Sequence, residues 1–349
     1  MKKLRIAFFD TKPYDREFFN RINEQYGYDI HYFTPHLTPD TVSLAAGYEV
    51  ACVFVNDIVT PEMIDELYNN GTRQLALRSA GYNNVNLQHA FGKIHVTRVP
   101  AYSPYAVAEH AVTLMLSLNR KIHKAYIRTR ESNFTLNGLL GFDMHGKTAG
   151  VIGTGKIGKV AIEILRGFGM KVLAYDVYPD KEFAQKHQVE YTDLDQIYRQ
   201  SDVITLHCPL TPENVYMINS RSIAKMKDGV MIINTGRGKL INTQDLIEGL
   251  KSKKIGSAGL DVYEEEGDYF FEDFSAEAIS DDVLARLLTF PNVLVTSHQA
   301  FFTREALESI AKTTLENIRL MHDESKFPNE ICYNCSEGKC VRKETGRCF

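Results

Sequence analysis

Residues 148–165 read TAGVIGTGKIGKVAIEIL, and this stretch decides the fold. It places Gly153, Gly155 and Gly158 in the spacing G-x-G-x-x-G, directly after an apolar run of strand length and directly before a segment of helical periodicity. The first glycine permits the tight turn, the second lets the backbone approach a pyrophosphate, and the third allows close packing of the helix. The stretch therefore predicts the strand–turn–helix unit of a dinucleotide-binding domain.

The residues around these glycines complete the predicted cofactor site. Thr154, Lys156 and Ile157 lie in the loop and the first helical turn, where backbone amides are available to an anion. The next apolar run, MKVLAYD, ends in Asp176, close to the spacing of about 20 residues expected for the acid that binds ribose hydroxyls. Because this carboxylate would repel the 2'-phosphate of NADP, and no arginine follows it immediately, NAD is the predicted cofactor.

Strand-like and helix-like segments alternate on both sides of this stretch. The apolar runs LRIAFF, DIHYF, VACVFV, QLALRS and IHVTRV precede it, and VLAYD, DVITLH, VMIINT, IGSAGLDV and NVLVTS follow it. Such βα alternation predicts parallel sheets. We expect an α/β fold with two doubly wound parallel-sheet (Rossmann-like) domains and an active-site cleft between them.

Two helical segments set the predicted domain boundaries. A proline at position 104 opens a long apolar helix that continues to Arg130 and bridges the two lobes. Thr303 is the expected N-cap of a second amphipathic helix, which returns to the first lobe. We predict a discontinuous substrate-binding (catalytic) domain over residues 1–102 and 299–331, an NAD-binding domain over residues 103–298, and a Cys-rich tail over residues 332–349.

Composition limits the class of partner. The chain has 349 residues, of which 44% are hydrophobic, and this length favours two cores over one. Its formal net charge of -4 is spread along the chain, which gives no electrostatic footprint for nucleic acid or an anionic membrane. No apolar stretch approaches the roughly 18 residues of a membrane span. We expect a soluble, cytoplasmic protein whose partner is a small molecule, with no nucleic acid and no membrane.

The C-terminal tail, CYNCSEGKCVRKETGRCF, is polar and aperiodic, so we expect no regular structure in it. Its thiols belong to Cys332, Cys335, Cys340 and Cys348. The first pair has the C-x-x-C spacing of a zinc knuckle, but the later gaps match no common ligand set, so no metal is predicted. A flexible reduced tail with exposed, redox-sensitive thiols is the expectation.

Three further segments, NTGRGKLIN, GLDVYEEEG and SHQAFF, lie where strands of the second series end, which is where open α/β sheets bind ligands. Arg237 stands between two glycines, and its planar guanidinium can form two parallel bonds to a carboxylate. His298 can shuttle a proton near neutral pH, as reduction of a ketone to an alcohol requires. A neighbouring glutamate would stabilise its imidazolium form.

Each of these residues also has an ordinary structural interpretation. An arginine is more commonly a solvated or ion-paired surface residue, and a histidine can be a satisfied core residue. Three adjacent glutamates, Glu264, Glu265 and Glu266, follow the second strand, and sequence chemistry alone does not choose among them.

With its glycine loop, arginine, acid and histidine in this order, the chain resembles the D-isomer-specific 2-hydroxyacid dehydrogenases, most closely the fermentative D-lactate dehydrogenases of bacteria. The likeness covers residues 1–331 and includes LRSAGYNNVNL, VPAYSPYAVAEHAVTLMLSLNR, LHCPLTPEN, MIINTGRG, GLDVYEEEGDYFFED and HQAFFT. It implies a catalytic set of Arg237, Glu266 and His298, because the family glutamate lies five residues beyond the aspartate of GLDV.

The resemblance also implies the remaining site residues. Backbone amides around Ser79, Ala80 and Gly81 would bind the substrate carboxylate, with Tyr102 beside it. Phe54 and Phe301 would wall the substrate methyl group, which suits pyruvate. His207 and Thr235 would line the cofactor cleft, and Asp261 would lie near the nicotinamide carboxamide.

The activity implied is reversible reduction of pyruvate to D-lactate with NADH, with histidine as general acid and base, in a homo-oligomer that is a dimer or tetramer. Alternatives are another 2-keto acid reductase, acting on glyoxylate, hydroxypyruvate or a branched substrate, and an NAD-sensing corepressor-like interaction protein. The chain lacks the long disordered flanks that such interaction proteins often carry. Formate dehydrogenases pair the histidine with glutamine, so Glu266 disfavours them.

Overall fold

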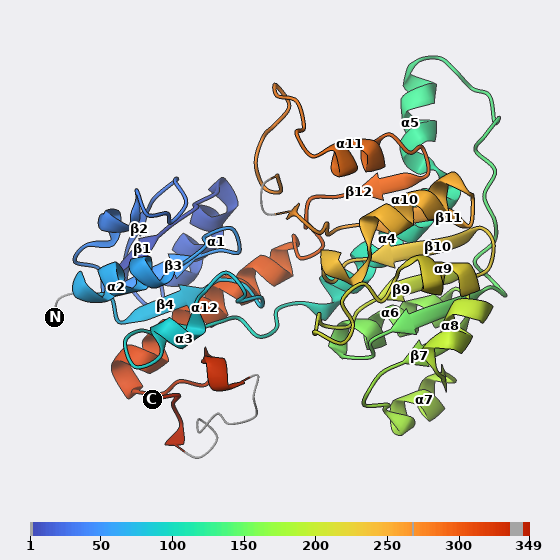
Figure 1. Ribbon diagram of the computed structural model, residues 1–349. Coiled ribbons are helices and arrows are strands. Elements are labelled where there is room, and N and C mark those ends of the chain that lie inside the picture. The colour runs from blue at the N-terminus through green and yellow to red at the C-terminus, as the bar shows by residue number, and fades with distance from the viewer. Residues whose placement is uncertain (1–2, 267–268, 336–344) are drawn as a thin grey trace. The chain divides into compact units, whose positions relative to one another are not determined.

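The computed structural model describes residues 3–266, 269–335 and 345–349, and it divides into two compact units (Figure 1). The first comprises Met1–Ser103 and Thr303–Phe349, and the second comprises Pro104–Phe302. Each unit is built on its own sheet flanked by helices, so the predicted α/β fold class is confirmed. The roles assigned to the two domains, and the cleft between them, stay predictions.

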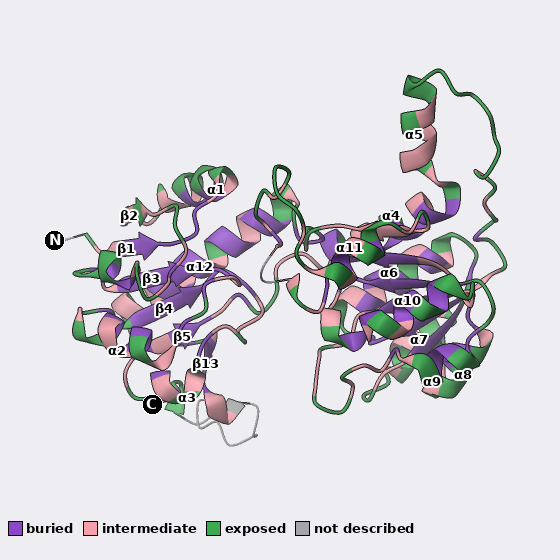
Figure 2. Ribbon diagram, turned by 45° about the horizontal axis from the view of Figure 1, so that its top comes forward, coloured by how far each residue is buried: buried purple, intermediate pink, exposed green. Residues whose placement is uncertain are grey.

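The sheet of the first unit has the strand order β13-β5-β4-β3-β1-β2. Its strands coincide with the five apolar runs that the sequence predicted, with one short addition at the edge that runs antiparallel to its neighbour. The bounds are β1 Arg5–Phe8, β2 Asp29–Tyr32, β3 Val50–Val53, β4 Gln74–Leu77, β5 His95–Thr97 and, antiparallel to β5, β13 Glu330–Ile331. The inner strands β3 and β4 are buried throughout (Figure 2), as parallel strands covered on both faces must be.

Helices flank this sheet, and the last of them comes from far along the chain. The helices are α1 Pro13–Asn23, α2 Pro61–Asn69, α3 Leu87–Ala90 and, from far along the chain, α12 Arg304–Glu324. Helix α12 packs on α1 and on β4, which makes the first unit discontinuous in sequence. The side chain of Thr303 accepts from the backbone N–H of Ala306 at 3.3 Å, so its predicted role as N-cap is confirmed.

The sheet of the second unit has the order β12-β11-β10-β9-β6-β7-β8, and its strands are parallel throughout their described pairing. The order reverses beside β6, which is where a doubly wound sheet binds its ligand. The bounds are β6 Thr148–Ile152, β7 Lys171–Tyr175, β8 Glu190–Tyr191, β9 Val203–Leu206, β10 Val230–Asn234, β11 Ile255–Leu260 and β12 Val293–Val295.

Two apolar cores lie on the two faces of this sheet. One contains side chains of α4 (Pro104–Arg120) and α6 (Lys156–Gly167), which also pack against each other. The other contains side chains of α8 (Leu194–Gln200), α9 (Ser220–Lys225), α10 (Thr243–Lys251) and α11 (Asp282–Leu288). The other α-helices described in this unit are α5 Ile122–Arg130 and α7 Lys181–His187, and Gly238–Leu240 forms a 3₁₀ turn.

The prediction of one continuous helix from Pro104 to Arg130 is wrong. Helix α4 ends at Arg120, Lys121 takes a left-handed conformation with φ +50°, and α5 begins at Ile122. A lysine in that conformation is uncommon, because the side chain crowds the following carbonyl. Figure 1 shows α5 and the loop after it standing away from the sheet of their unit.

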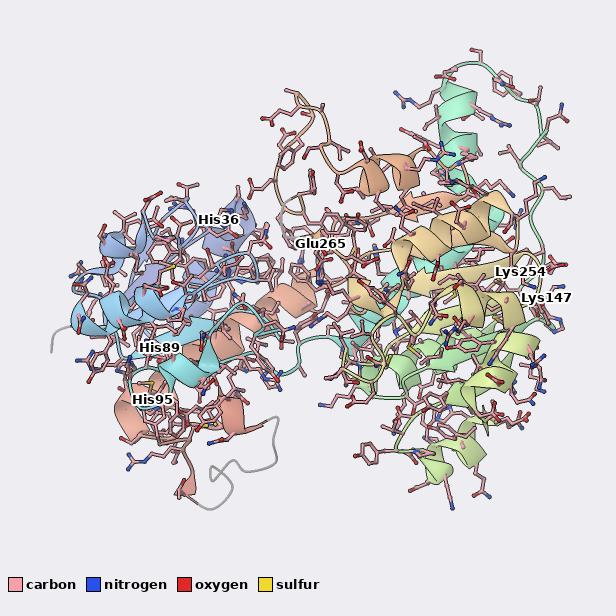
Figure 3. The ribbon with its side chains drawn as sticks, in the orientation of Figure 1. His36, His89, His95, Lys147, Lys254 and Glu265 are labelled. Atoms are coloured by element: carbon pink, nitrogen blue, oxygen red, sulfur yellow. The ribbon has the colours of Figure 1, made fainter. Side chains whose placement is uncertain are left out.

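The prediction of exposed thiols in the tail is wrong for two of its cysteines. Cys332 and Cys348 are buried, with 5% and 2% of their surface exposed. The N–H of Cys348 donates to the buried carboxylate of Glu330, and the ring of Phe349 stacks on His95 (labelled in Figure 3) at 4.3 Å. The segment Tyr333–Cys335 forms a 3₁₀ turn. The side chain of Cys335, and Cys340, lie outside the described residues.

Within the described ranges, no helix is both long enough and apolar enough to cross a lipid bilayer.

Candidate active site

The glycine loop of the second unit joins β6 to α6, and its shape depends on two of the predicted glycines. Gly153 has φ +92°, and a Cβ there would lie 2.5 Å from the backbone nitrogen of Cys208. A Cβ on Gly158 would lie 2.0 Å from the carbonyl oxygen of Gly153. Larger residues at either position would force backbone apart, so the chain can take this path only with glycine.

The second glycine of the motif, Gly155, leaves open space above the loop. A Cβ on Gly155 would meet no atom within 4 Å, and Gly155 is the N-cap of α6 with no side-chain cap. Lys156 and Ile157 begin the helix, so their amide groups lie among those that an α-helix leaves without internal partners. Uncapped amides beside open space are what a pyrophosphate requires.

Three other predicted cofactor residues, Asp176, His207 and Thr235, follow the strands β7, β9 and β10 of the same sheet. Thr154 donates through its backbone N–H to Asp176, at the end of β7, at 2.6 Å. Burial lowers the pKa of His207 to about 4, so its ring is neutral near pH 7. Thr235 is buried after β10, and its hydroxyl has no hydrogen-bond partner among the described residues. A buried hydroxyl left unpaired, an open loop and a fixed carboxylate together fit a bound dinucleotide.

Arg237 follows β10 in the same unit and is half-buried. One of its guanidinium nitrogens, Nη1, donates to the carbonyl of Gly236 at 2.7 Å, and its own carbonyl accepts from Asn234 at 2.9 Å. A Cβ on Gly238 would lie 2.0 Å from the carbonyl oxygen of Tyr263, so the glycine on its C-terminal side allows this close approach. Across the described ranges no carboxylate lies within 4.0 Å of this guanidinium, which leaves it able to bind an acidic ligand.

His298 follows β12 and pairs with one of the three candidate glutamates. Its Nδ1 lies 2.9 Å from Oε1 of Glu266, whose Oε2 accepts from the backbone N–H of Tyr263 at 3.1 Å. Both side chains are about three-quarters covered, with 22% and 26% of their surface exposed. A carboxylate on Nδ1 fixes the ring and leaves Nε2 for a proton transfer.

The other two glutamates have structural partners. Glu264 accepts from the hydroxyl of Tyr216 and from the backbone N–H of Thr243, both at 2.7 Å. Glu265 (labelled in Figure 3) is exposed and lies 3.7 Å from the ammonium of Lys239. The geometry therefore places Glu266 beside the histidine, as the family spacing implied, although a catalytic role for it stays a prediction.

Asp261 has a role in the structure that the sequence did not indicate. Its fully buried carboxylate accepts from the Thr296 hydroxyl at 2.5 Å and from the backbone N–H groups of Gln299 and Ala300, both at 2.9 Å. His298, between these partners, has φ +50°. Asp261 thus fixes the loop that carries the histidine, and its predicted contact with a nicotinamide carboxamide stays a prediction.

Sequence reasoning missed one member of this network. Nε2 of His110, on α4, lies 3.1 Å from the Thr296 hydroxyl and 3.3 Å from Asp261. The contact joins residues far apart in sequence, so local pattern held no signal for it.

The predicted substrate residues of the first unit lie after two adjacent strands. Phe54 follows β3 and is buried under the guanidinium of Arg78, 4.8 Å from its ring centre. Ser79, Ala80 and Gly81 follow β4 in a tight loop, in which the Ser79 hydroxyl donates to the Gly81 carbonyl at 2.8 Å. These four residues thus follow the carboxyl ends of two adjacent parallel strands, β3 and β4.

Two other predicted substrate residues, Tyr102 and Phe301, lie within two residues of the points in the sequence where one unit ends and the other begins. Tyr102 is half-buried in the first unit, and Phe301 is 7% exposed in the second. Their contact with a substrate stays a prediction.

Comparison with known proteins places this fold and site in a family. The model for the NAD-binding domain of the D-isomer-specific 2-hydroxyacid dehydrogenases matches residues 112–300. The chain is 52% identical to D-lactate dehydrogenase of Escherichia coli (strain K12), over 94% of this chain and 100% of that protein. The chain therefore belongs to the D-isomer-specific 2-hydroxyacid dehydrogenase family, and the resemblance drawn from its motifs is confirmed.

Solved structures agree with this assignment. The structure of Salmonella D-lactate dehydrogenase matches with a TM-score of 0.85 and 52% identity, over 94% of this chain and 100% of that one. D-2-hydroxyisocaproate dehydrogenase matches with a TM-score of 0.82 and 30% identity, over 94% and 99%. A similar D-lactate dehydrogenase from Lactobacillus jensenii was solved with NAD⁺. The chain is an NAD-dependent dehydrogenase of this family, and the cofactor prediction is confirmed.

Proposed function

We propose that this protein is a D-lactate dehydrogenase that reduces pyruvate to D-lactate at the expense of NADH. The observation that carries the proposal is the His298–Glu266 pair at 2.9 Å. The same unit holds the guanidinium of Arg237, with which no described carboxylate forms an ion pair. Relatives named D-lactate dehydrogenase, about half identical to this chain over nearly its full length, support the substrate.

The chain's own residues supply binding and proton transfer. Arg237 binds and orients the keto acid through paired N–H donors, which polarise its oxygens. Protonated His298 gives its Nε2 proton to the carbonyl oxygen, while Glu266 on Nδ1 stabilises the imidazolium. NADH, when bound, supplies the hydride to the carbonyl carbon, so pyruvate, NADH and a proton become D-lactate and NAD⁺.

Phe54 and Phe301 support a small substrate side chain. Each ring is buried, with 8% and 7% of the residue exposed, so neither can turn aside easily to admit a bulky group. Arg78 above Phe54 restrains the first ring further. We propose that these two rings limit the substrate to pyruvate and keto acids of similar size.

A substrate panel tests this assignment. We expect kcat/KM for pyruvate to exceed that for 4-methyl-2-oxopentanoate by at least about 10-fold, since even one surplus methylene group changes discrimination by roughly 10-fold or more. Glyoxylate and hydroxypyruvate complete the panel, and chiral analysis should find D-lactate as the product. Because D-2-hydroxyisocaproate dehydrogenase also matches this chain, a preference for the branched acid would replace the proposal with that activity.

We also propose that the enzyme works in cytoplasmic fermentation. Its cofactor is NADH, and Cys52 and Cys208 are free thiols, as a reducing compartment favours.

A homo-oligomer, either a dimer or a tetramer, is the final part of the proposal. Exposed apolar side chains cluster on α5 and the loop after it, which we call the arm (residues 122–142). The exposed fractions range from 54% to 88% for Ile122, Tyr126, Ile127, Phe134, Leu136 and Leu140. An apolar segment this exposed marks an interaction surface, and a second copy of the chain is the occupant we propose.

Light scattering after size exclusion tests the arm. The native protein should elute at a multiple of 39.6 kDa, and Ile127→Glu combined with Leu136→Asp should shift the mass toward the monomer. Leu44→Glu, at a position 42% exposed but outside the arm, is the matched control and should leave the mass unchanged. A monomeric native protein, or an arm variant of unchanged mass, would contradict the proposal.

A further inference from the structure

The short edge strand β8 brings a tyrosine to the cofactor end of the second sheet. Tyr191 is aligned with Ala174 of β7, two residues before the acidic Asp176. Its hydroxyl lies 2.8 Å from Oγ1 of Thr154, in the glycine loop. Tyr191 is therefore joined to the loop that meets the cofactor.

The direction of each hydrogen bond in this chain of contacts is fixed by chemistry. Oγ1 of Thr154 lies 3.0 Å from Oδ2 of Asp176, and an ionised carboxylate can only accept. The Thr154 hydroxyl therefore donates to Asp176, and so it must accept from Tyr191. A hydroxyl that accepts a hydrogen bond donates more strongly itself, so Tyr191 strengthens the bond between Thr154 and Asp176.

These contacts fix the orientation of the Asp176 carboxylate. Oδ2 accepts from both the N–H and the hydroxyl of Thr154, and Oδ1 accepts from the N–H of Tyr178 at 2.9 Å. In the described part of the chain, no lysine or arginine lies within 4.0 Å of it. Lys159, on α6, is paired with Asp180. The negative charge of Asp176 is thus uncompensated and its position is set.

We infer that Tyr191 is a positioning residue for cofactor selection. Acting through Thr154, it holds Asp176 where the carboxylate accepts from the ribose hydroxyls of NAD and repels the 2'-phosphate of NADP. The inference rests on the family's use of NAD and is independent of which keto acid is reduced.

Direct cofactor binding tests the inference. Apoenzyme is titrated with NADH and with NADPH, and cofactor fluorescence gives each Kd. For Tyr191→Phe we expect the Kd for NADH to rise about 3- to 10-fold, the effect of one hydrogen bond, with the Kd for NADPH unchanged or lower. Tyr198→Phe removes a hydroxyl that donates to the Met217 carbonyl in the same unit, and it should leave both values unchanged.

A second set of variants separates positioning from general destabilisation. If Tyr191 acts through Asp176, then adding Tyr191→Phe to Asp176→Ala should change the Kd for NADH no further. Thr154→Val removes the hydroxyl that joins Tyr191 to Asp176, and it provides the test if Tyr191→Phe does not fold. An equal loss of both cofactors, an unchanged ratio of the two Kd values, or a further loss in the Asp176→Ala background would overturn the inference.

Discussion

Replacing His298 with asparagine is expected to lower kcat for pyruvate reduction by about 10²- to 10⁴-fold, the usual contribution of a positioned general acid. Asparagine tolerates the left-handed φ of +50° at this position better than most residues, so the loop should keep its path. It cannot carry the proton that we propose His298 delivers. Steady-state assays with NADH and pyruvate measure the loss.

The control must show that the site itself survives. NADH should bind His298→Asn with nearly native affinity, because the glycine loop and Asp176 are unchanged. His187→Asn is the matched control: Nε2 of His187 lies 3.5 Å from Glu163 in the same unit, its side chain is covered to a similar extent as that of His298, and no role in turnover is expected for it. A rate for His298→Asn within about twofold of native would remove His298 from the mechanism.

The regular parts of the fold were predictable because each one repeats a local signal. Buried parallel strands appear in the sequence as continuous apolar runs, and the runs ending near Phe8, Val53 and Leu77 are strands in the structure. The glycine loop was predictable for a different reason. Its spacing meets steric demands that the structure displays at Gly153 and Gly158.

Parts of the fold without such a signal were missed. The break at Lys121 has neither glycine nor proline, so helical periodicity continued across it. Strands β8 and β13 have two residues each, too few to show any period, and β13 is stabilised by pairing with β5 from far along the chain. Pairing with a neighbouring strand, which no local pattern records, defines β8 and β13.

The site shows the same division. Residue type and strand position indicated Arg237 and His298, but the choice of Glu266 over its two neighbours required either family spacing or the observed 2.9 Å contact. Burial of Cys348 depends on Glu330 and on Phe349 stacking over His95. No local pattern records such contacts, which is why the tail was expected to be exposed.

Replacing Arg237 with lysine is expected to lower kcat/KM for pyruvate by about 100-fold, through a higher KM and a lower kcat together. Lysine keeps the positive charge but loses the planar pair of donors, so the keto acid is held less tightly and at a less favourable angle. A displacement of about 1 Å at a reacting centre costs on the order of 10² in rate. NADH binding should remain native, since no predicted cofactor contact changes.

The matched control for Arg237→Lys is Arg221→Lys, at an exposed position on α9 in the same unit, which should leave both kcat and KM unchanged. Oxamate, a non-reactive analogue of pyruvate, separates binding from chemistry when titrated against the enzyme with NADH bound. Its affinity should fall with that of pyruvate, because both present a carboxylate to the guanidinium. If oxamate and pyruvate bind Arg237→Lys as they bind the native enzyme, then another cation binds the substrate, and the role proposed for the Arg237 guanidinium is wrong.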